Sequence, residues 1–533
     1  MIKFKKIYIN LFFIIIIFFA GLLTERFQLD NKLSNSFKNT YDNFFRLIYT
    51  LLPREEISII IAPKEYKKII EIREKSIIQT KLTKDLEKWS KGKLYSKDHE
   101  HDIQIRLKGV FPDHWIDKNQ WSFKVKIKDK SKSFNGYKRF ALQSPKTTSY
   151  IYEWLFMKAL EKENLFSLGA DFIDVNINDK NLGAYMLIGQ ISKEVIKKNN
   201  KKIAPIIGFD SELWIKEQML SSELNSKGVV KKENGAEDVY YRVKINPIQF
   251  SEKESNLNDL KQAINLLESF RQGKIKTSDA FDADHLAKVM ALRALLGSYQ
   301  FDWLDTKFYY NPRTKLLEPI SKEIHVDLNH NYKVYYPTWW IDSYINRPDY
   351  EKNKDFFVDD LYKDKKFYEK YLKQLNYYSN NNFYKKLIEE NSKEFKSYLN
   401  MLKMNYPTKK VFSEEHLEIT RLRIINYLNP VQGLNVYFSN YEDGKLKLNL
   451  SNLQRLPIQI LGINFNDGTR IRLSNKISLS GRKPFLPIET KEIEINCEYK
   501  NLCKKSKIDN QRIVFKIMGQ EIEKSADISP FYK

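Results

Sequence analysis

The chain has only two cysteines among its 533 residues, Cys497 and Cys503 in the segment CEYKNLC. Two thiolates with no histidine beside them are too few ligands for a structural zinc site, which takes four. The even count and the short spacing favour one small disulfide loop in an exported chain.

Several signatures of well-defined enzyme classes are also absent. The chain has no GxxxxGK[ST] phosphate loop, no glycine-rich dinucleotide fingerprint, no zinc-protease helix and no nucleophile elbow. It has neither solenoid repeats nor a low-complexity tract. Function must therefore be inferred from how particular side chains are grouped.

Composition indicates a folded chain of several domains. At 533 residues the chain is too long for one core, and a hydrophobic fraction of 42% is ample for packed domains. The net charge of +23 favours anionic partners such as lipid headgroups, acidic glycans, nucleotides or nucleic acid. A general bias toward lysine gives the same surplus, so charge alone does not select a partner.

The N-terminus predicts a membrane segment. Three lysines precede an apolar run from Ile7 to Leu23 that only Asn10 interrupts. This pattern predicts a transmembrane signal anchor over residues 1–24, single-pass in the inner (cytoplasmic) membrane, with the bulk of the chain extracytoplasmic. A cleaved signal peptide is the alternative, and both export the rest of the chain. Export makes nucleic acid an unexpected partner.

Periodicity divides the remaining chain into three parts. Residues 25–55 are interpreted as a stalk, and residues 56–428 as one α+β domain with a helical C-terminal part. Within it, period-two segments such as HDIQIRLKG and WSFKVKIKD predict half-buried antiparallel strands. From residue 429 to residue 533, short strands separated by turn signals predict a β-sandwich.

Acidic residues flank one predicted β-hairpin. KFYY and KLLEPI are expected to pair across NPRT, where Pro312 presets the turn. The two outer ends then lie side by side, which brings Asp302 and Asp305 near Glu323 and Asp327. Two carboxylates joined by a hairpin suit phosphoryl transfer, because one can orient a hydroxyl while the other holds a metal ion. Solvated loop acids are the alternative interpretation.

Seven segments of the sequence, taken together, resemble the spore coat protein H (CotH) kinase family. In chain order they are IRLKGVFPDHW, WSFKVKI, GYKRFALQSP, YIYEWLF, DVNINDKNLGAYML, SKEVIKKNNKKIAPIIGFD and KFYYNPRTKLLEPI. The resemblance implies a two-lobed atypical protein-kinase-like fold that binds ATP with Mg²⁺ or Mn²⁺ and phosphorylates hydroxyl groups. Asp302 or Asp305 would be catalytic, and Glu323 with Asp327 would hold the metal.

The chain departs from the family pattern at several positions. Gln120 stands where many relatives carry a lysine, and Ile188 and Gly189 replace an acidic pair. Asp305 stands where an asparagine is expected, and Glu323 where an aspartate is expected, which displaces the carboxylate by one methylene. These departures favour a catalytically inactive pseudokinase as the alternative.

Two further groups are candidate ligands. Arg106, Lys108, Lys124 and Lys126 lie on neighbouring predicted strands and are expected to bind phosphate oxygens of ATP, although a solvated strand face gives the same pattern. The segment DHEHD, residues 98–102, places two histidines two residues apart, which suits either a metal site or a polar turn.

Together these features predict an α+β protein: a two-lobed kinase-like domain between a transmembrane helix and a C-terminal β-sandwich. The expected function is an extracytoplasmic CotH-like atypical kinase that transfers phosphate from ATP to a hydroxyl on a surface protein or anionic glycan. The alternative is an inactive binding scaffold in cell-envelope or surface assembly.

Overall fold

A computed structural model provides the structure of the protein. It describes residues 56–97, 99–129, 131–226, 236–252, 256–298, 303–326, 328, 356–429, 432–482, 487–497, 503, 508 and 511–529. These residues fall into two compact units. The first comprises the described residues up to Lys158 with 168–198 and 388–413, and the second comprises those of 159–167, 199–387 and 414–533.

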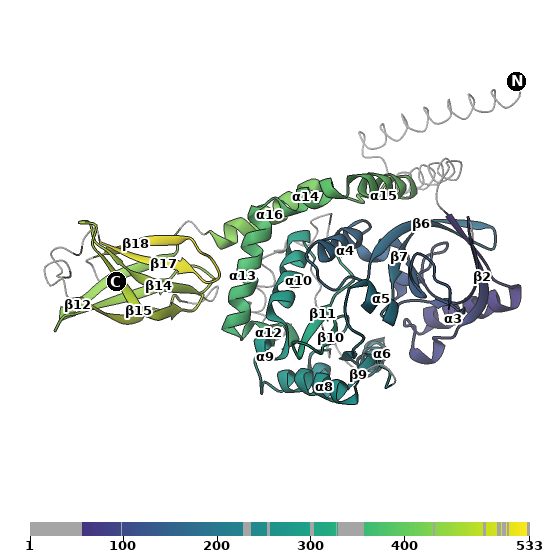
Figure 1. The fold of residues 1–533 in the computed structure, drawn as a ribbon, viewed down its shortest axis with the longest axis horizontal. Coiled ribbons are helices and arrows are strands. Elements are labelled where there is room, and N and C mark those ends of the chain that lie inside the picture. Colours follow the sequence, from purple (N-terminus) through teal and green to yellow (C-terminus); the bar gives the residue numbers. More distant parts are fainter. Residues whose placement is uncertain are drawn as a thin grey trace, which may run out of the picture. The chain divides into compact units, whose positions relative to one another are not determined.

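The first unit contains a closed β-barrel of seven strands in the order β1-β2-β3-β4-β5-β7-β6 (Figure 1). Its strands are β1 (Glu56–Ile60), β2 (Ser90–Ser96), β3 (His99–Leu107), β4 (Phe123–Ile127), β5 (Arg139–Gln143), β6 (Ala170–Ile177) and β7 (Lys180–Gly189). The barrel closes where β1 pairs in parallel with β6, with Ile57 opposite Val175. Closure leaves no strand of this sheet with an unpaired edge.

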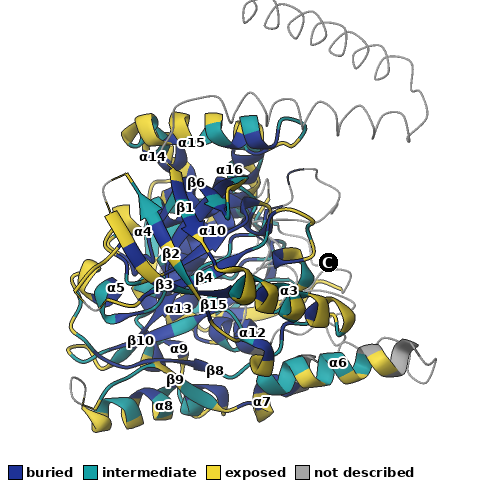
Figure 2. Ribbon diagram, turned by 90° about the vertical axis from the view of Figure 1, so that its right-hand side faces the viewer, coloured by how far each residue is buried: buried dark blue, intermediate teal, exposed yellow. Residues whose placement is uncertain are grey.

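The barrel core follows from the alternation of the strands. On β4, Phe123, Val125 and Ile127 are buried while Lys124 and Lys126 are half-exposed, as the period-two pattern predicts. The helices of this unit include α3 (Pro63–Ile78), α5 (Lys193–Lys198) and α15 (Ser392–Asn405). Figure 2 shows exposed positions along α3, in line with its many charged residues.

The second unit contains a four-stranded sheet with helices. The sheet order is β11-β10-β8-β9. Its strands are β8 (Ile206–Phe209), β9 (Ile245–Gln249), β10 (Lys307–Asn311) and β11 (Leu316–Ile320). The helices are α6 (Glu212–Ser226), α7 (Ala236–Arg242), α8 (Leu257–Arg271), α9 (Thr277–Ala280), α10 (Ala283–Leu296), α12 (Phe356–Tyr362), α13 (Lys365–Asn380) and α16 (Glu414–Leu428). Two more, α4 (Tyr152–Lys162) and α14 (Phe383–Glu390), contribute residues to both units.

Helix α10 is the central element of this unit, with 11 of its 14 residues buried. Asp282 caps its N-terminus by accepting hydrogen bonds from the backbone N–H groups of Asp284 and His285. Gly297 ends it in the left-handed conformation, at φ +77°. A Cβ at position 297 would lie 2.4 Å from Nε2 of His416, so this turn requires glycine.

The C-terminal strands form one continuous sheet of seven strands in the order β15-β14-β17-β18-β12-β13-β16. They are β12 (Leu434–Glu442), β13 (Lys445–Asn452), β14 (Ile458–Asn464), β15 (Arg470–Leu479), β16 (Lys491–Asn496), β17 (Arg512–Ile517) and β18 (Glu523–Ser529). Cys497 and Cys503 are joined, which confirms the predicted disulfide.

The predicted fold class is wrong. The strands expected to form part of a two-lobed kinase-like domain close into a seven-stranded barrel. The strands predicted from HDIQIRLKG and WSFKVKIKD are present as β3 and β4. The parallel pair of β1 and β6 joins segments more than 100 residues apart, beyond the reach of periodicity.

The predicted membrane anchor over residues 1–24 and the stalk over 25–55 lie outside the described residues. Within the described ranges, no helix has both the length and the apolar character that a bilayer crossing requires.

Candidate functional site

The ends of the β10–β11 hairpin bring acidic residues together around one lysine. In the antiparallel register Lys307 lies opposite Ile320, so the residues just outside this pair are neighbours. Nζ of Lys322 lies 3.9 Å from Oδ1 of Asp305 and forms a closer ion pair with Oε1 of Glu323. Asp302 and Asp327 lie outside the described residues.

Buried Arg293 holds the segment that carries Glu323. Arg293 lies in the last turn of α10 and is 2% exposed. One amino group, Nη1, donates to Ser321 Oγ at 2.8 Å and to the Lys322 carbonyl at 3.0 Å. The other, Nη2, donates to Ser298 Oγ and to the Glu323 carbonyl, both at 3.1 Å. The planar guanidinium therefore fixes the backbone of residues 321–323 against the end of α10.

Glu323 has a strained backbone. Its φ of +62° is in the left-handed region, which costs a residue with a Cβ about 1–2 kcal/mol. Such strain persists only where surrounding contacts impose it, and it is concentrated at functional sites. Here the contacts with Arg293 impose it. Residues 321–323 are thus held in one conformation, with the Glu323 carboxylate near Lys322 and Asp305.

Aromatic packing fixes the other side of the site. Trp303, just before Asp305, is 6% exposed, and its ring centroid lies 5.9 Å from the rings of both Phe209 and Tyr240. The Leu304 carbonyl accepts a hydrogen bond from Lys307 Nζ at 2.5 Å. Asp305 therefore follows an anchored segment.

A second polar cluster lies beside the middle of strand β11. Asp282, His285 and Glu318 each offer one ligand atom, and these atoms lie within 4.8 Å of one another. No other group of three or more possible metal ligands converges among the residues described. Burial raises the pKa of the Asp282 carboxyl, but the hydrogen bonds from His285 and from Asp284 outweigh it, so the pKa is lowered overall.

The basic residues expected to bind phosphate belong to the first unit. Arg106 is 7% exposed, pairs with Glu87 at 2.8 Å and lies over the Trp89 ring. Arg106 is thus committed to barrel contacts. Lys108 is also buried, and its backbone N–H donates to the Ser122 carbonyl.

Lys124 and Lys126 lie on the half-exposed face of β4. Lys124 is opposite Arg106 in the β3–β4 register, and Lys126 is opposite Gln104. The strand positions of these lysines agree with the sequence interpretation, whereas their binding of phosphate stays a prediction.

The residues at the departures from the family pattern have structural contacts. Gln120 is 4% exposed; its amide donates to the Leu182 and Ala184 carbonyls and accepts from Ser144 and Tyr406. This amide has its full set of partners and connects strands of the barrel.

Gly189, in place of the expected second acid, lies in a crowded position on β7. A Cβ at this position would lie 2.4 Å from the Leu168 carbonyl oxygen and 2.6 Å from a ring carbon of Tyr137. An aspartate or glutamate at position 189 therefore does not fit the barrel as it is built.

The histidine pair of the DHEHD segment lies on β3. Its ring centroids are 6.1 Å apart, and His101 is 4% exposed with its ring beside Phe134. Neither ring nitrogen of His101 has a hydrogen-bond partner among the described residues. Burial, and then the positive charge of Lys132, lowers the pKa of His101. Asp98 lies outside the described residues.

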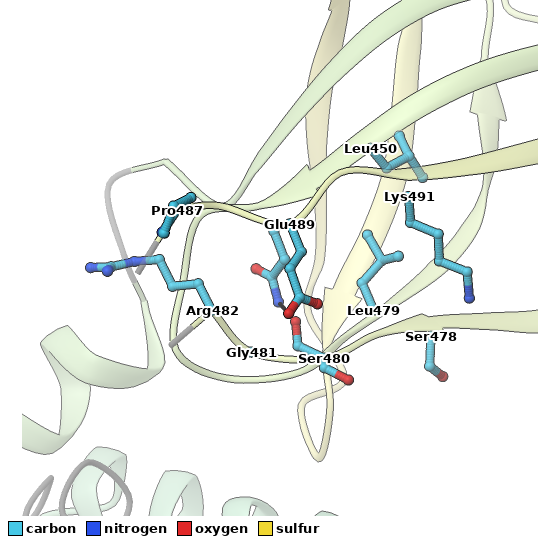
Figure 3. Close-up of a pocket in the computed structure, with 10 residues that line it drawn as sticks. Leu450, Ser478, Leu479, Ser480, Gly481, Arg482, Pro487, Glu489 and Lys491 are labelled. Atoms are coloured by element: carbon cyan, nitrogen blue, oxygen red, sulfur yellow. Dashed lines mark hydrogen bonds between the residues drawn. The ribbon is translucent and has the colours of Figure 1, made fainter. Parts of the chain in front are cut away.

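The C-terminal sheet has a small pocket of about 140 Å³, lined by residues between Leu450 and Lys491 (Figure 3). Asn452 uses its amide to bind the Leu456 and Ser480 carbonyls, and Arg482 donates to the Leu453 carbonyl. Figure 3 shows the Arg482 side chain pointing away from Glu489. Ligand pockets usually have about 300–1,000 Å³, so this one is too small for a nucleotide.

Comparison with known proteins identifies no relative: no family model matches the chain, and no curated protein is significantly similar to it. The resemblance to the CotH kinase family therefore stays a prediction.

Sequence reasoning missed Arg293, Lys322 and the cluster of Asp282, His285 and Glu318. One available signal was Arg293, which lies near the end of a largely apolar helix. A buried guanidinium needs several hydrogen-bond acceptors, so it indicates polar groups nearby. The Asp-x-x-His spacing at a helix start is another, because residues three apart share a helix face.

Proposed function

We propose that the protein is a membrane-anchored, extracytoplasmic phosphotransferase that uses ATP with Mg²⁺ or Mn²⁺ at the hairpin site. The observation that carries the proposal is the strained backbone of Glu323, which buried Arg293 holds beside Lys322 and Asp305. The proposal depends on this site and not on a kinase-like fold, since the same chemistry occurs on unrelated folds.

The donor set suits a hard divalent cation. Asp305 and Glu323 share the single ammonium group of Lys322, so the three side chains carry a net negative charge. Mg²⁺ and Mn²⁺ prefer carboxylate oxygens, and Glu323 would hold the ion, with Asp327 as the further predicted ligand. When bound, the metal would neutralise charge on the phosphates.

An aspartate would act on the acceptor hydroxyl. Asp305, or Asp302, would orient an acceptor hydroxyl and accept its proton. A new bond forms between the acceptor oxygen and the γ-phosphorus as the bond from that phosphorus to the β–γ bridging oxygen breaks. ADP leaves with that electron pair. The acceptor would be a hydroxyl on a surface protein or an anionic glycan, and the apolar run over residues 7–23 would anchor the chain in the inner membrane.

An inactive binding scaffold in envelope or surface assembly is the second candidate, and Lys322 favours it. A lysine that pairs with both acids can hold them together without a metal ion. The departures at Gln120 and Gly189 favour the same alternative, because both residues have structural contacts in the barrel.

Thermal melting of the full chain in detergent separates these candidates. With Mg²⁺ or Mn²⁺ present, ATP at about 100 times its dissociation constant should stabilise the protein by about 2.7 kcal/mol, and ATP without metal should not. Glu323→Gln should abolish the stabilisation, and Glu521→Gln, at an exposed position, should keep it. A melting temperature that does not respond to millimolar ATP and metal would reject the phosphotransferase and leave the scaffold.

A further inference from the structure

The cluster of Asp282, His285 and Glu318 lies where the start of α10 is joined to β11, two elements that lie side by side in Figure 1. The backbone N–H of Asp282 donates to the Leu317 carbonyl at 2.9 Å, and Phe281 forms a parallel bridge with Leu317. Glu318 is the next residue of the strand. Main-chain contacts therefore fix the positions from which these side chains project.

The two helix residues are already aligned with each other. Asp282 and His285 are three residues apart, so they share one side of the first turn. Oδ1 of Asp282 caps the helix, and Oδ2 lies 2.7 Å from Nδ1 of His285. The carboxylate and the imidazole therefore already face each other in this structure.

Glu318 brings a buried negative charge to the cluster. It is 2% exposed, and a carboxylate is seldom buried to this degree unless a cation compensates it. Asn311 Nδ2 donates to Oε1 at 2.6 Å. The other oxygen, Oε2, forms an ion pair with Lys201, whose Nζ lies 2.5 Å away. This pair lacks hydrogen-bond geometry, so Oε2 has no hydrogen-bond partner among the described residues. The negative charge at this buried oxygen is therefore compensated by one lysine.

We propose that Asp282, His285 and Glu318 bind one divalent transition-metal ion, with Zn²⁺ as the preferred ion. An imidazole with two carboxylates is a ligand set typical of zinc and neighbouring metals, whereas Mg²⁺ and Ca²⁺ prefer all-oxygen ligands. The Lys201 ammonium compensates the charge of Glu318 when no metal is bound, and it must move away when the metal binds.

The bound ion would fasten α10 to β11. These two elements also carry the hairpin site, since Arg293 lies in the last turn of α10 and β11 leads into residues 321–323. The metal would therefore be structural, and it would stiffen the support of the hairpin site without contacting the substrate. This proposal does not depend on the phosphotransferase proposal.

Zinc binding by the full chain in detergent tests the proposal, with Zn²⁺ titrated against a chelating indicator. The wild type should bind one Zn²⁺ per chain, and His285→Ala and Glu318→Gln should each weaken binding by about tenfold or more. Lys201→Met should strengthen binding by about tenfold, because it removes a positive charge that competes with the ion. Circular dichroism of each variant checks that the fold persists.

Two control variants make the result specific. His99→Ala removes a histidine of the β3 pair, and Glu323→Gln alters the hairpin site, so neither should change zinc affinity. Absence of stoichiometric zinc binding, or unchanged affinity in His285→Ala, would overturn the proposal. The zinc proposal would also be overturned if Lys201→Met destabilises the fold and does not strengthen zinc binding. The cluster would then be a structural ion-pair network. Glu323→Gln is expected to change ATP binding and not zinc binding. Failure of the zinc proposal is therefore distinguishable from failure of the phosphotransferase proposal.

Discussion

At the scale of single residues, the structure separates side chains that maintain the fold from those placed for chemistry. Gln120 and Gly189 stand at positions where catalytic groups were expected, and their contacts are those of barrel packing. Glu323 is the opposite case, because its backbone is strained and another buried residue maintains the strain. This contrast makes the hairpin ends the main candidate site.

His101 predicts a pH dependence of stability. Because burial holds its folded-state pKa below the ordinary histidine value of about 6.5, the unfolded chain binds the proton more readily. The contribution of His101 to stability is therefore fully present above pH about 6.5 and falls as the pH drops toward the folded-state pKa.

Urea unfolding of the wild type and of His101→Leu between pH 7.5 and pH 5 measures this contribution. The free energy of unfolding should decline less on acidification in His101→Leu than in the wild type. If the free energy of unfolding falls equally on acidification in His101→Leu and in the wild type, His101 does not cause the pH dependence. Lys132, Asp129 and His99 are the charged or titratable groups that act on His101.

At the scale of elements, the sequence predicted what local pattern determines. The two halves of KFYYNPRTKLLEPI coincide with β10 and β11, as the hairpin pattern predicted. The neighbouring positions of Asp305 and Glu323 followed from hairpin geometry alone. The Asp282–His285–Glu318 cluster did not, because it depends on the start of α10 lying against β11, a contact between elements far apart in the chain.

The connection between α10 and residues 321–323 gives a prediction at this scale. Arg293→Met removes the four hydrogen bonds described above and leaves buried carbonyl groups without them. The free energy of unfolding should fall by about 3 kcal/mol or more. Amide hydrogen exchange at residues 321–324 should become faster.

Arg423→Met is the matched control, because Arg423 lies on the exposed side of α16. It should change the free energy of unfolding by about 0.5 kcal/mol or less. Equal destabilisation in the two variants would show that Arg293 has no special role in holding the hairpin end.

At the scale of the whole molecule, the main error of sequence interpretation was the fold class. Alternating strands such as FKVKI were recognised, but alternation does not reveal the order in which strands pair. The barrel also includes β2, whose sequence SKGKLYS is polar and contains glycine, and closes by the parallel pairing of β1 with β6. The local sequence pattern therefore predicted individual strands and the candidate site at the hairpin. It did not predict that the strands of the first unit close into a barrel.

The most direct test of the account is to locate the metal–nucleotide complex on the chain. Because both native cysteines form a disulfide, Thr314→Cys at the exposed hairpin turn gives one thiol for a spin label. With Mn²⁺ and ATP, and with His285→Ala to remove the second cluster, pulsed electron paramagnetic resonance measures the distance from Mn²⁺ to the label. The account predicts about 20 Å, since five strand residues span about 17 Å. Loss of this distance in Glu323→Gln would support the site, whereas no bound Mn²⁺, or a distance unaffected by that substitution, would contradict it.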